Sequence, residues 1–431
     1  MPVTNRTDLK KMTKPLKVLL CGACMAGNMG GAALYMSMVE SLKQLVDNVD
    51  VILLSKYPKD DQGPCEELHW RMVPFPTRMQ FLYGVPFSVA YWMLHLLRLP
   101  RHWLVRGPFA AYLDNDLLID LSGISFTDDR PLSGLVINCL WLLPAIATGI
   151  PWIKASQTMG PFTKPWVRVV SRFFLTRAVA LVARGASSAQ FVRELLPRCK
   201  VYELPDVAFV LRPAPGEDIS DALESAHLEP SEQYCVVGPS FVVDTMMRRM
   251  TGESTYPRLM AKVTDELVEL SGQKVLLLPH ARATTSSSLD DLNVCEETLE
   301  MCKHSERVRV LRYKWSASVL KGVISRAEVA IGSRFHFMVA AMSSGVPGLA
   351  ITWSHKYLEM LRMVGQERFA IAHDDLTEEI LLAKIRELWA NRESVRREIE
   401  ERLPEVKRLA AANANVALKA LADKQMDLAI T

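Results

Sequence analysis

The sequence predicts an α/β protein made of two Rossmann-like domains that face each other across a cleft, with closing helices at the C-terminus. Short apolar runs of strand length alternate with longer stretches at helical spacing along nearly the whole chain. This alternation lapses once, in a proline-rich and acidic stretch around residues 204–221. At 431 residues, the chain is also longer than one hydrophobic core usually organises.

The predicted first domain covers residues 16–210 and follows a loose tail of residues 1–15. Its predicted strands are short apolar runs that end in polar or turn-forming residues. They span residues 16–20, 51–54, 117–121, 152–155 and 180–183, and a helix is expected over residues 32–45. Because helical segments separate these runs, we expect a parallel sheet.

The predicted second domain covers residues 231–431 and follows a linker at residues 211–230. Its expected strands span residues 234–237, 274–278, 308–311, 329–331 and 349–352, with a helix over residues 337–344. Residues 377–424 alternate charges with Leu, Ile and Ala at helical spacing, which predicts one or two closing helices. Two facing domains of this kind form the architecture called GT-B.

The composition is typical of a soluble globular enzyme, with 49% apolar and 23% charged residues. A net charge of +3, from 51 basic and 48 acidic residues, argues against a nucleic-acid partner. The first seventeen residues contain no apolar segment, so we expect no signal peptide. The eight cysteines lack the spacing of a disulfide scaffold, and together these features indicate a cytoplasmic protein.

Two apolar regions raise the question of a membrane. Residues 132–153 are long enough to span a bilayer, but Pro144, Gly149 and Pro151 predict a helix followed by a buried strand. Residues 79–112 are apolar and basic and could lie on a membrane surface. The simpler interpretation of this second region is an amphipathic helical pair packed on the sheet. A peripheral position at the inner face of a membrane therefore stays open.

The most informative polar stretch is residues 332–336, Gly-Ser-Arg-Phe-His, which ends one predicted strand and begins a helix. Ligands of parallel α/β sheets bind at the carboxyl ends of strands, and a helix N-terminus favours an anion. Arg334 is a permanent cation and His336 can move a proton. Their position predicts chemistry on a phosphate or a carboxylate.

Two further predicted strands end in basic residues. Arg184 follows residues 180–183, and His280 and Arg282 follow residues 274–278. Taken singly, such residues are more often surface groups or satisfied polar contacts. Three basic strand ends in two facing domains instead indicate an anion site.

A glycine-rich loop follows the first strand and contains Gly27, Asn28 and Gly30. It lacks the Lys-Ser/Thr pair of a P-loop and the spacing of a dinucleotide fingerprint. It could bring backbone N–H groups close to a ligand, or it could be a tight turn that only glycine tolerates. Cys21 and Cys24 match a redox Cys-x-x-Cys only superficially, and no second pair completes a zinc site, so we expect no metal.

The loop of residues 127–131 precedes an apolar stretch, which makes Thr127 or Asp128 the expected N-cap, with Pro131 in the first turn. Because the loop leaves the end of a predicted strand, a catalytic carboxylate is the alternative role. Asp128 and Asp129 are the candidates for it.

Several short motifs occur in one order along most of the chain. They are Gly27-Asn28-Met29-Gly30, the loop of residues 120–126, Gln157-Thr158-Met159-Gly160-Pro161, Arg184 with Ser187 or Ser188, Pro205-Asp206-Val207-Ala208-Phe209, Arg334-x-His336, Gly345-Val346-Pro347 and Lys356. In this order they resemble the polysaccharide pyruvyl transferase family. Two departures from the family pattern are Gly31 and Gly185, where the family usually has aspartate.

The resemblance implies a GT-B-like fold and transfer of pyruvate from phosphoenolpyruvate onto two hydroxyls of a saccharide, which forms a cyclic ketal. This reaction belongs to the biosynthesis of exopolysaccharides or cell-surface glycans. Phosphoenolpyruvate would be a co-substrate and no cofactor is expected. The implied partners are phosphoenolpyruvate and a saccharide acceptor that could be lipid-linked, with no nucleic acid.

For this reaction we expect Arg184 and Arg334 to clamp the carboxylate and phosphate of phosphoenolpyruvate from opposite domains. His336 is the expected general acid, with Asp128 or Asp129 as weaker candidates. The remaining expected substrate-binding residues are Asn28, Gly30, Ser122, Gly123, Gln157, His280, Arg282 and Lys356.

Two alternative functions stay open. A nucleotide-sugar glycosyltransferase of the retaining kind would place two glutamates across the loop and helix after Gly332, but residues 332–342 contain no carboxylate. Glu359 and Glu367 have the right spacing and come one element later. A non-catalytic relative that acts as an envelope-biosynthesis scaffold is favoured only by Gly31 and Gly185.

Overall fold

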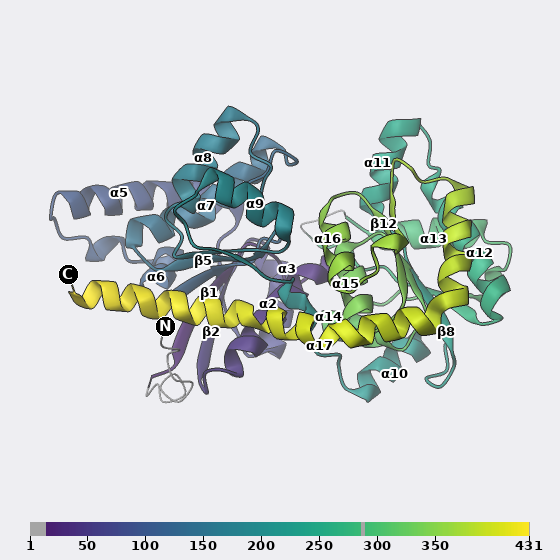
Figure 1. The fold of residues 1–431 in the computed structure, drawn as a ribbon. Coiled ribbons are helices and arrows are strands. Elements are labelled where there is room, and N and C mark those ends of the chain that lie inside the picture. The colour runs from purple at the N-terminus through teal and green to yellow at the C-terminus, as the bar shows by residue number, and fades with distance from the viewer. Residues whose placement is uncertain (1–13, 286–288, 431) are drawn as a thin grey trace. The chain divides into compact units, whose positions relative to one another are not determined.

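The computed structural model describes residues 14–285 and 289–430, so most of the predicted tail of residues 1–15 lies outside the described part. The chain divides into two compact units (Figure 1). The first unit contains the described residues up to Ala26, Leu34–Val207 and the chain from Leu409 onward. The second contains Gly27–Ala33 and Ala208–Arg408, so the glycine-rich loop groups with the second unit.

The first unit is built on a seven-stranded parallel sheet in the order β3-β2-β1-β4-β5-β6-β7. Its strands are β1 (Leu16–Cys21), β2 (Val49–Ser55), β3 (Arg71–Pro74), β4 (Leu117–Asp120), β5 (Trp152–Gln157), β6 (Ala180–Ala183) and β7 (Val201–Glu203). The order reverses between β1 and β4, where Cys21 pairs with Asp120. Such a reversal is where open α/β sheets bind their ligands, outside the carboxyl ends of the strands.

The helices of the first unit are distributed over both faces of this sheet. They are α2 (Met29–Lys43), α3 (Pro58–Glu67), α4 (Thr77–Met79), α5 (Val85–Leu96), α6 (Gly107–Leu113), α7 (Leu132–Thr148), α8 (Pro165–Leu175) and α9 (Ala186–Leu195), with a π-helical turn η1 (Gln80–Gly84) and a 3₁₀ turn η2 (His102–Leu104). Crossovers between parallel strands are right-handed, so reversing the direction of strand addition changes the covered face. Accordingly, α5, α7, α8 and α9 cover one face of the sheet and α2 the other (Figure 1).

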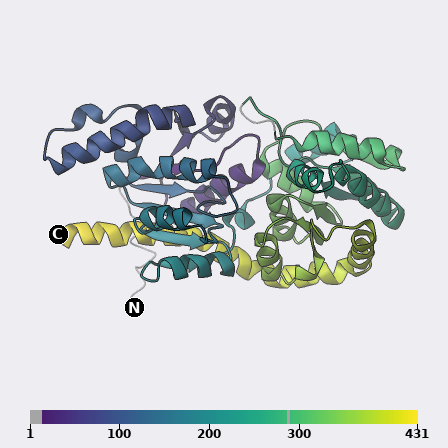
Figure 2. The same cartoon turned by 90° about the horizontal axis from the view of Figure 1, so that it is seen from above.

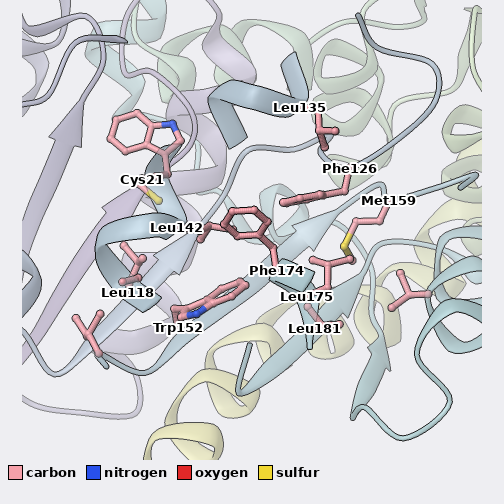
Figure 3. Close-up of a cluster of buried hydrophobic side chains, with 14 of the residues drawn as sticks. Cys21, Leu118, Phe126, Leu135, Leu142, Trp152, Met159, Phe174, Leu175 and Leu181 are labelled. Carbon is pink, nitrogen blue, oxygen red and sulfur yellow. The ribbon is translucent and has the colours of Figure 1, made fainter. Parts of the chain in front are cut away.

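One hydrophobic core cluster of the first unit lies between the sheet and the layer of α7 and α8 (Figure 3). Leu118, Trp152 and Leu181 contribute from strands, Leu142 from α7 and Phe174 from α8. Trp141 meets Phe75 edge to face, with ring centroids 5.8 Å apart. Because both faces of a parallel sheet are covered, its strands are continuous apolar runs, which is the pattern that made the central strands predictable.

The second unit contains a six-stranded parallel sheet in the order β10-β9-β8-β11-β12-β13. Its strands are β8 (Tyr234–Gly238), β9 (Lys274–Leu277), β10 (Val308–Val310), β11 (Ala330–Gly332), β12 (Gly348–Thr352) and β13 (Ala370–Ala372). Its helices are α10 (Gly216–Ser225), α11 (Phe241–Thr251), α12 (Tyr256–Ser271), α13 (Asp291–Met301), α14 (Ala317–Ser325), α15 (Phe335–Ser343) and α16 (Lys356–Met363), with 3₁₀ turns η3 (Val207–Val210), η4 (Ser305–Arg307) and η5 (Glu367–Phe369).

The closing segment is one helix, α17 (Glu378–Ile430), drawn mostly in yellow in Figures 1 and 2. Up to Arg408 it groups with the second unit, and from Leu409 with the first. The sequence pattern predicted one or two helices here and assigned all of them to the second domain. The residues 211–230 that were predicted as a linker contain α10, whose Ile219, Ala222 and Leu223 are buried at helical spacing.

Three strands escaped prediction: β3, β7 and β13. Each ends a sheet in the strand order and is three or four residues long. Edge strands are often short, and charged side chains such as Arg71 and Glu203 protect them from pairing with other chains. They therefore lack the apolar run that marks a central strand.

The apolar residues 132–153 form α7 followed by the start of β5, as predicted. The predicted N-cap was wrong: Pro131 is the N-cap of α7, and no side chain caps this helix. Asp128 instead accepts hydrogen bonds from Thr163 Oγ1 at 2.8 Å and from the backbone N–H groups of Thr163 and Lys164. These bonds hold Asp128 against the chain after β5. Helix α7 therefore begins after Pro131, a few residues later than the predicted N-cap.

Within residues 14–285 and 289–430, no helix combines the length and the apolarity needed to cross a membrane.

Candidate functional site

In the first unit, polar side chains gather at the carboxyl ends of β4 and β5 around Asp120. Lys154 Nζ lies 2.5 Å from Asp120 Oδ2, and both side chains are fully buried. Gln157 Nε2 donates to the Asp120 carbonyl at 2.6 Å and to its Oδ1 at 3.0 Å. Ser122 donates to Asp120 Oδ1 from its hydroxyl at 2.5 Å and from its backbone N–H at 2.9 Å. The buried carboxylate of Asp120 is therefore paired with a cation and hydrogen-bonded by groups of the protein itself.

Two glycines shape this strand end. Gly22 follows the last residue of β1 and has φ +101°, and a Cβ there would come within 2.4 Å of Ser122 Oγ, so glycine is required where the chain leaves β1 beside the end of β4. Gly123 has φ +71°, and its carbonyl accepts the Thr158 N–H at 2.9 Å. The glycines therefore serve the backbone path in addition to any role in binding.

Arg184 lies at the end of β6 and is almost fully buried, with 3% of its side chain exposed. Its Nη1 lies 2.5 Å from Asp206 Oδ2, and its Nε donates to Thr158 Oγ1 at 3.0 Å. We call Asp120, Ser122, Gly123, Lys154, Gln157, Arg184 and Asp206 the first-unit cluster. Both of its ion pairs join a buried cation to a buried carboxylate.

The second unit brings the glycine-rich loop against the strand end that carries His280 and Arg282. Asn28 forms an antiparallel bridge with Ala281, and the Arg282 N–H donates to the Gly27 carbonyl at 2.9 Å. Asn28 Oδ1 accepts the Gly30 N–H at 3.1 Å and closes the turn that begins α2. The loop thereby becomes a fixed part of the second unit.

Gly30 lies directly against the imidazole of His336. A Cβ at position 30 would stand 2.1 Å from His336 Nδ1, a distance that no pair of non-bonded heavy atoms tolerates. Glycine is therefore required at position 30 for His336 to keep its place. This contact joins two motifs that lie about three hundred residues apart in the sequence.

Arg334 is the N-cap residue of α15, and a buried carboxylate fixes its guanidinium. Arg334 Nη2 lies 2.6 Å from Asp291 Oδ1, and Nε lies 3.0 Å from Oδ2. Asp291 also accepts the N–H groups of Phe241 at 2.9 Å and Ala281 at 2.8 Å. Burial alone would lower the pKa of Arg334, but the charge and hydrogen bonds of Asp291 outweigh it and raise that pKa. Arg334 keeps 12% of its side chain exposed.

The neighbouring carboxylate orients a second arginine. Arg282 Nε lies 3.1 Å from Asp290 Oδ1, which also accepts the Leu292 N–H at 2.9 Å as the N-cap of α13. Sequence reasoning missed Asp290 and Asp291. The available signal was an Asp-Asp pair directly before a helical pattern, which marks an N-cap. That signal names a cap, but it does not reveal the two arginines that these carboxylates hold.

His280 lies buried beside this group, with Phe337 edge to face at 6.4 Å between ring centroids. Burial, followed by the charges of His336 and Arg334, lowers the pKa of His280 to about 3. His280 is therefore a neutral imidazole at physiological pH, able to donate one hydrogen bond and accept another.

Lys356 begins α16 and is buried among aromatic rings. Its Nζ lies 4.0 Å from the ring centroid of Trp353 and 5.2 Å from that of Phe335. Tyr357 in turn donates from its hydroxyl to the Ser333 carbonyl at 2.8 Å and so fixes the end of β11. We call Asn28, Gly30, His280, Arg282, Asp290, Asp291, Arg334, His336 and Lys356 the second-unit cluster.

The predicted site residues thus fall into two groups. The structure brings seven of them together in the second-unit cluster: Asn28, Gly30, His280, Arg282, Arg334, His336 and Lys356. The other four, Ser122, Gly123, Gln157 and Arg184, lie in the first-unit cluster. Asp128, a weaker candidate for the acid, accepts hydrogen bonds from the backbone N–H groups of Thr163 and Lys164 in the chain after β5.

Comparison with known proteins gives a family and a fold. The model of the family described as polysaccharide pyruvyl transferase matches residues 28–355, which is more than half of the chain. The amylovoran biosynthesis protein AmsJ of Erwinia amylovora is 20% identical over 409 residues, which cover 89% of this chain and 94% of that protein.

Among solved structures, the UDP-GlcNAc 2-epimerase from Neisseria meningitidis bound to UDP-GlcNAc is similar with a TM-score of 0.58 and 11% identity, over 95% of this chain and 100% of that chain. Anabaena Alr3699/HepE in complex with UDP and glucose has a TM-score of 0.54 and 12% identity, over 95% and 100%. At these identities the likeness establishes the fold, which is GT-B-like with two Rossmann-like domains. The family match identifies the chain itself: it belongs to the polysaccharide pyruvyl transferase family.

Proposed function

We propose that this protein transfers the pyruvyl group of phosphoenolpyruvate onto two hydroxyls of a saccharide, forming a cyclic ketal during exopolysaccharide or cell-surface glycan biosynthesis. Family membership supports pyruvyl transfer to a polysaccharide. The observation that carries the proposal is the packing of Gly30 against His336, next to an arginine fixed by Asp291. It joins a proton carrier to a cation that suits an anionic donor.

The reaction needs a proton at one carbon and a positive field around two anionic groups. Protonation of the methylene carbon of phosphoenolpyruvate makes the adjacent carbon electrophilic, and a first sugar hydroxyl adds there. The phosphate then leaves and a second hydroxyl closes the ring. One hydroxyl proton replaces the proton delivered to the methyl carbon, and the other leaves with the phosphate group. A single acid that is reprotonated in each turnover can serve both transfers.

His336 is the residue we assign to this proton transfer. Its imidazole is held by Gly30 on one side and by the edge-to-face ring of Phe335, at 5.2 Å between centroids, on the other. A fixed orientation is what general acid catalysis requires of a side chain. His280, with its pKa lowered to about 3, would remain neutral beside it and could hydrogen-bond to substrate without becoming charged.

Arg334 is the residue we assign to the anionic groups of the donor, with Arg282 and Lys356 in the same unit as further cations. The predicted clamp by Arg184 and Arg334 stays a prediction. Arg334 is the more exposed of the two, at 12% against 3% for Arg184. That difference favours Arg334 as the arginine that contacts phosphoenolpyruvate.

Incubation of the protein with phosphoenolpyruvate and candidate glycans tests the proposal. We expect release of inorganic phosphate in step with a mass gain of one pyruvyl group on the glycan. Thermal unfolding should shift upward with phosphoenolpyruvate and stay unchanged with nucleotide sugars. Sugar transfer from a nucleotide sugar, with no phosphate released from phosphoenolpyruvate, would overturn the assignment.

The glycosyltransferase alternative rests on the shared fold. Its retaining form needs carboxylates near the start of α15, yet α15 contains none. Glu359 lies in α16 and Glu367 in η5, beyond β12. A scaffold without activity would release no phosphate under either condition, so the same assay distinguishes all three functions.

A further inference from the structure

Exposed large apolar side chains are concentrated in one segment of the first unit. Nineteen large apolar side chains are exposed among the described residues, and nine of them lie between Phe81 and Trp103. Each is between 45 and 68% exposed. These nine residues, which we call the α5 surface, are Phe81, Leu82, Val89, Trp92, Met93, Leu96, Leu97, Leu99 and Trp103. Clusters of this size on a soluble protein mark a binding surface.

The α5 surface belongs to a well-packed element. The opposite face of α5 is already satisfied, because Tyr91 packs against Phe109 with ring centroids 5.2 Å apart. Tyr83 stacks on Phe87 at 3.8 Å, and its hydroxyl donates to the Arg106 carbonyl at 2.6 Å. Since one face of α5 already packs in the core, the exposed apolar stripe of Val89, Trp92 and Leu96 on the other face is not needed to pack this helix. An apolar helix with one open face needs a second apolar environment.

The chain segment that carries the α5 surface contains charges of one sign. Residues 68–113 contain no aspartate or glutamate, but they include Arg71, Arg78, Arg98, Arg101 and Arg106. Over residues 68–193 there are thirteen basic and five acidic residues, a net charge of +8, whereas the whole chain has +3. Two of these basic residues, Lys154 and Arg184, are buried in ion pairs, and the others include the exposed Arg98, Arg106, Arg168 and Arg172. The basic charge is thus concentrated in the part of the first unit that contains the α5 surface.

Helix α8 repeats the pattern on the same side of the sheet. Trp166, Val169 and Phe173 are exposed at helical spacing, and Arg168 and Arg172 are exposed between them. Both α5 and α8 pack on α7, in the layer that covers one face of the sheet (Figure 1). The outer side of this layer is therefore apolar and basic on two of its helices.

We propose that the α5 surface binds the interface of an anionic phospholipid membrane. The apolar side chains enter the boundary between headgroups and acyl chains, and the arginines meet the anionic headgroups. Two exposed tryptophans, Trp92 and Trp103, suit this boundary, because tryptophan is enriched at membrane interfaces. A protein partner of matching charge would need an acidic rim around an apolar groove. A membrane needs only the apolar stripe and the basic flank, and both are present here. This inference goes beyond the proposed function.

Co-sedimentation of the full chain with lipid vesicles tests the proposal. We expect binding to vesicles of phosphatidylcholine with phosphatidylglycerol, weaker binding to pure phosphatidylcholine, and partial release at high salt. The double variant Trp92→Ser, Leu96→Ser should bind at least about tenfold more weakly, because burying one such side chain changes a partition coefficient by roughly tenfold or more. Met301→Ser with Ile380→Ser, two exposed apolar residues of the second unit, is the matched control and should bind normally.

A charge variant separates the two contributions. Arg98→Gln with Arg106→Gln should weaken binding to anionic vesicles by about tenfold or more at low salt and leave binding to neutral vesicles unchanged. Pyruvyl transfer to a water-soluble acceptor should be normal in all of these variants.

Three results would overturn the proposal. One is absence of vesicle binding by the full chain, and another is unchanged binding by the Trp92→Ser, Leu96→Ser variant with a normal circular dichroism spectrum. The third is a dimer in analytical ultracentrifugation that this variant abolishes while neither protein binds vesicles. That outcome would assign the α5 surface to a second copy of the chain.

Discussion

The two polar clusters occupy equivalent places, at the carboxyl ends of parallel strands, but they differ in how their charges are arranged. In the first-unit cluster, Lys154 pairs with Asp120 and Arg184 with Asp206, and these side chains are almost fully buried. In the second-unit cluster, Arg334 and Arg282 are held by Asp291 and Asp290 and stay partly exposed, next to His280 and His336.

This difference supports a proposal about which cluster carries the chemistry. Position at a strand end makes a site accessible in principle, whereas catalysis also needs a group that exchanges protons and a cation that can meet the substrate. The second-unit cluster offers candidates for both, His336 and Arg334, whereas the charges of the first-unit cluster are paired in buried ion pairs. We therefore propose that the second-unit cluster carries the catalysis and that the first-unit cluster fixes the strand ends.

The largest expected effect comes from Asp291, on which the second-unit cluster depends. Asp291→Ala leaves the Arg334 guanidinium without its buried partner and two N–H groups without an acceptor. We expect a loss of about 3–5 kcal/mol in the free energy of unfolding, measured by denaturant titration. Asp374→Ala, at an exposed position, should change it by less than about 0.5 kcal/mol. A loss below about 1 kcal/mol for Asp291→Ala would show that this carboxylate does not organise the cluster.

Next in size is the effect of Gly30→Ala. The new Cβ would stand 2.1 Å from His336 Nδ1, so the imidazole must move. Because a displacement of about 1 Å can reduce a rate 10²-fold, we expect kcat to fall by about that factor while the protein stays folded. Gly63→Ala in α3, where a Cβ meets nothing within 4 Å, is the matched control and should be fully active. Full activity of Gly30→Ala would separate position 30 from catalysis.

A smaller effect should appear as pH dependence of stability, through His280. Its pKa is about 3 in the folded protein and near 6.5 when unfolded. The unfolded state binds the proton first as pH falls, so the stability that neutral His280 provides is complete above about pH 6.5 and is lost toward pH 3. Between pH 7 and pH 5 we expect the protein to lose about 2 kcal/mol more than a His280→Gln variant. Equal losses in both proteins would place His280 in a more polar environment than the structure shows.

The smallest change in stability is expected when Arg184 and Asp206, which form one of the two ion pairs of the first-unit cluster, are replaced together. Arg184→Met alone removes the cation that pairs with the buried Asp206 and should destabilise strongly, whereas Arg184→Met with Asp206→Leu should be within about 1 kcal/mol of the native protein. The double variant should also keep its KM for phosphoenolpyruvate. A large rise in that KM would instead support the clamp by Arg184 and Arg334 and would move part of the substrate site to the first-unit cluster.

The central strands of both sheets could be predicted from sequence because strands buried on both faces are continuous apolar runs. The edge strands β3, β7 and β13 and helix α10 could not, since short or mixed segments give weak periodicity. The basic residues at strand ends were likewise predictable, and family motifs selected the same positions.

The partners of those basic residues could not be predicted from the sequence. Nothing near Arg334 in the sequence points to Asp291, and nothing near Gly30 points to His336. Such contacts depend on how distant loops pack, which a pattern within one segment does not encode. The N-cap assigned to Thr127 or Asp128 was wrong for the same reason, because Asp128 pairs with a loop about thirty-five residues away.

The most direct test of the central claim is the turnover of His336→Ala with phosphoenolpyruvate and an acceptor glycan. If the second-unit cluster carries the chemistry through His336, kcat should fall by roughly 10²–10⁴ with the free energy of unfolding nearly unchanged. His304→Ala, which alters a histidine near the protein surface in the same unit, should keep normal turnover. Turnover of His336→Ala within about twofold of the native enzyme would contradict the assignment of catalysis to the second-unit cluster through His336 and remove His336 from the mechanism.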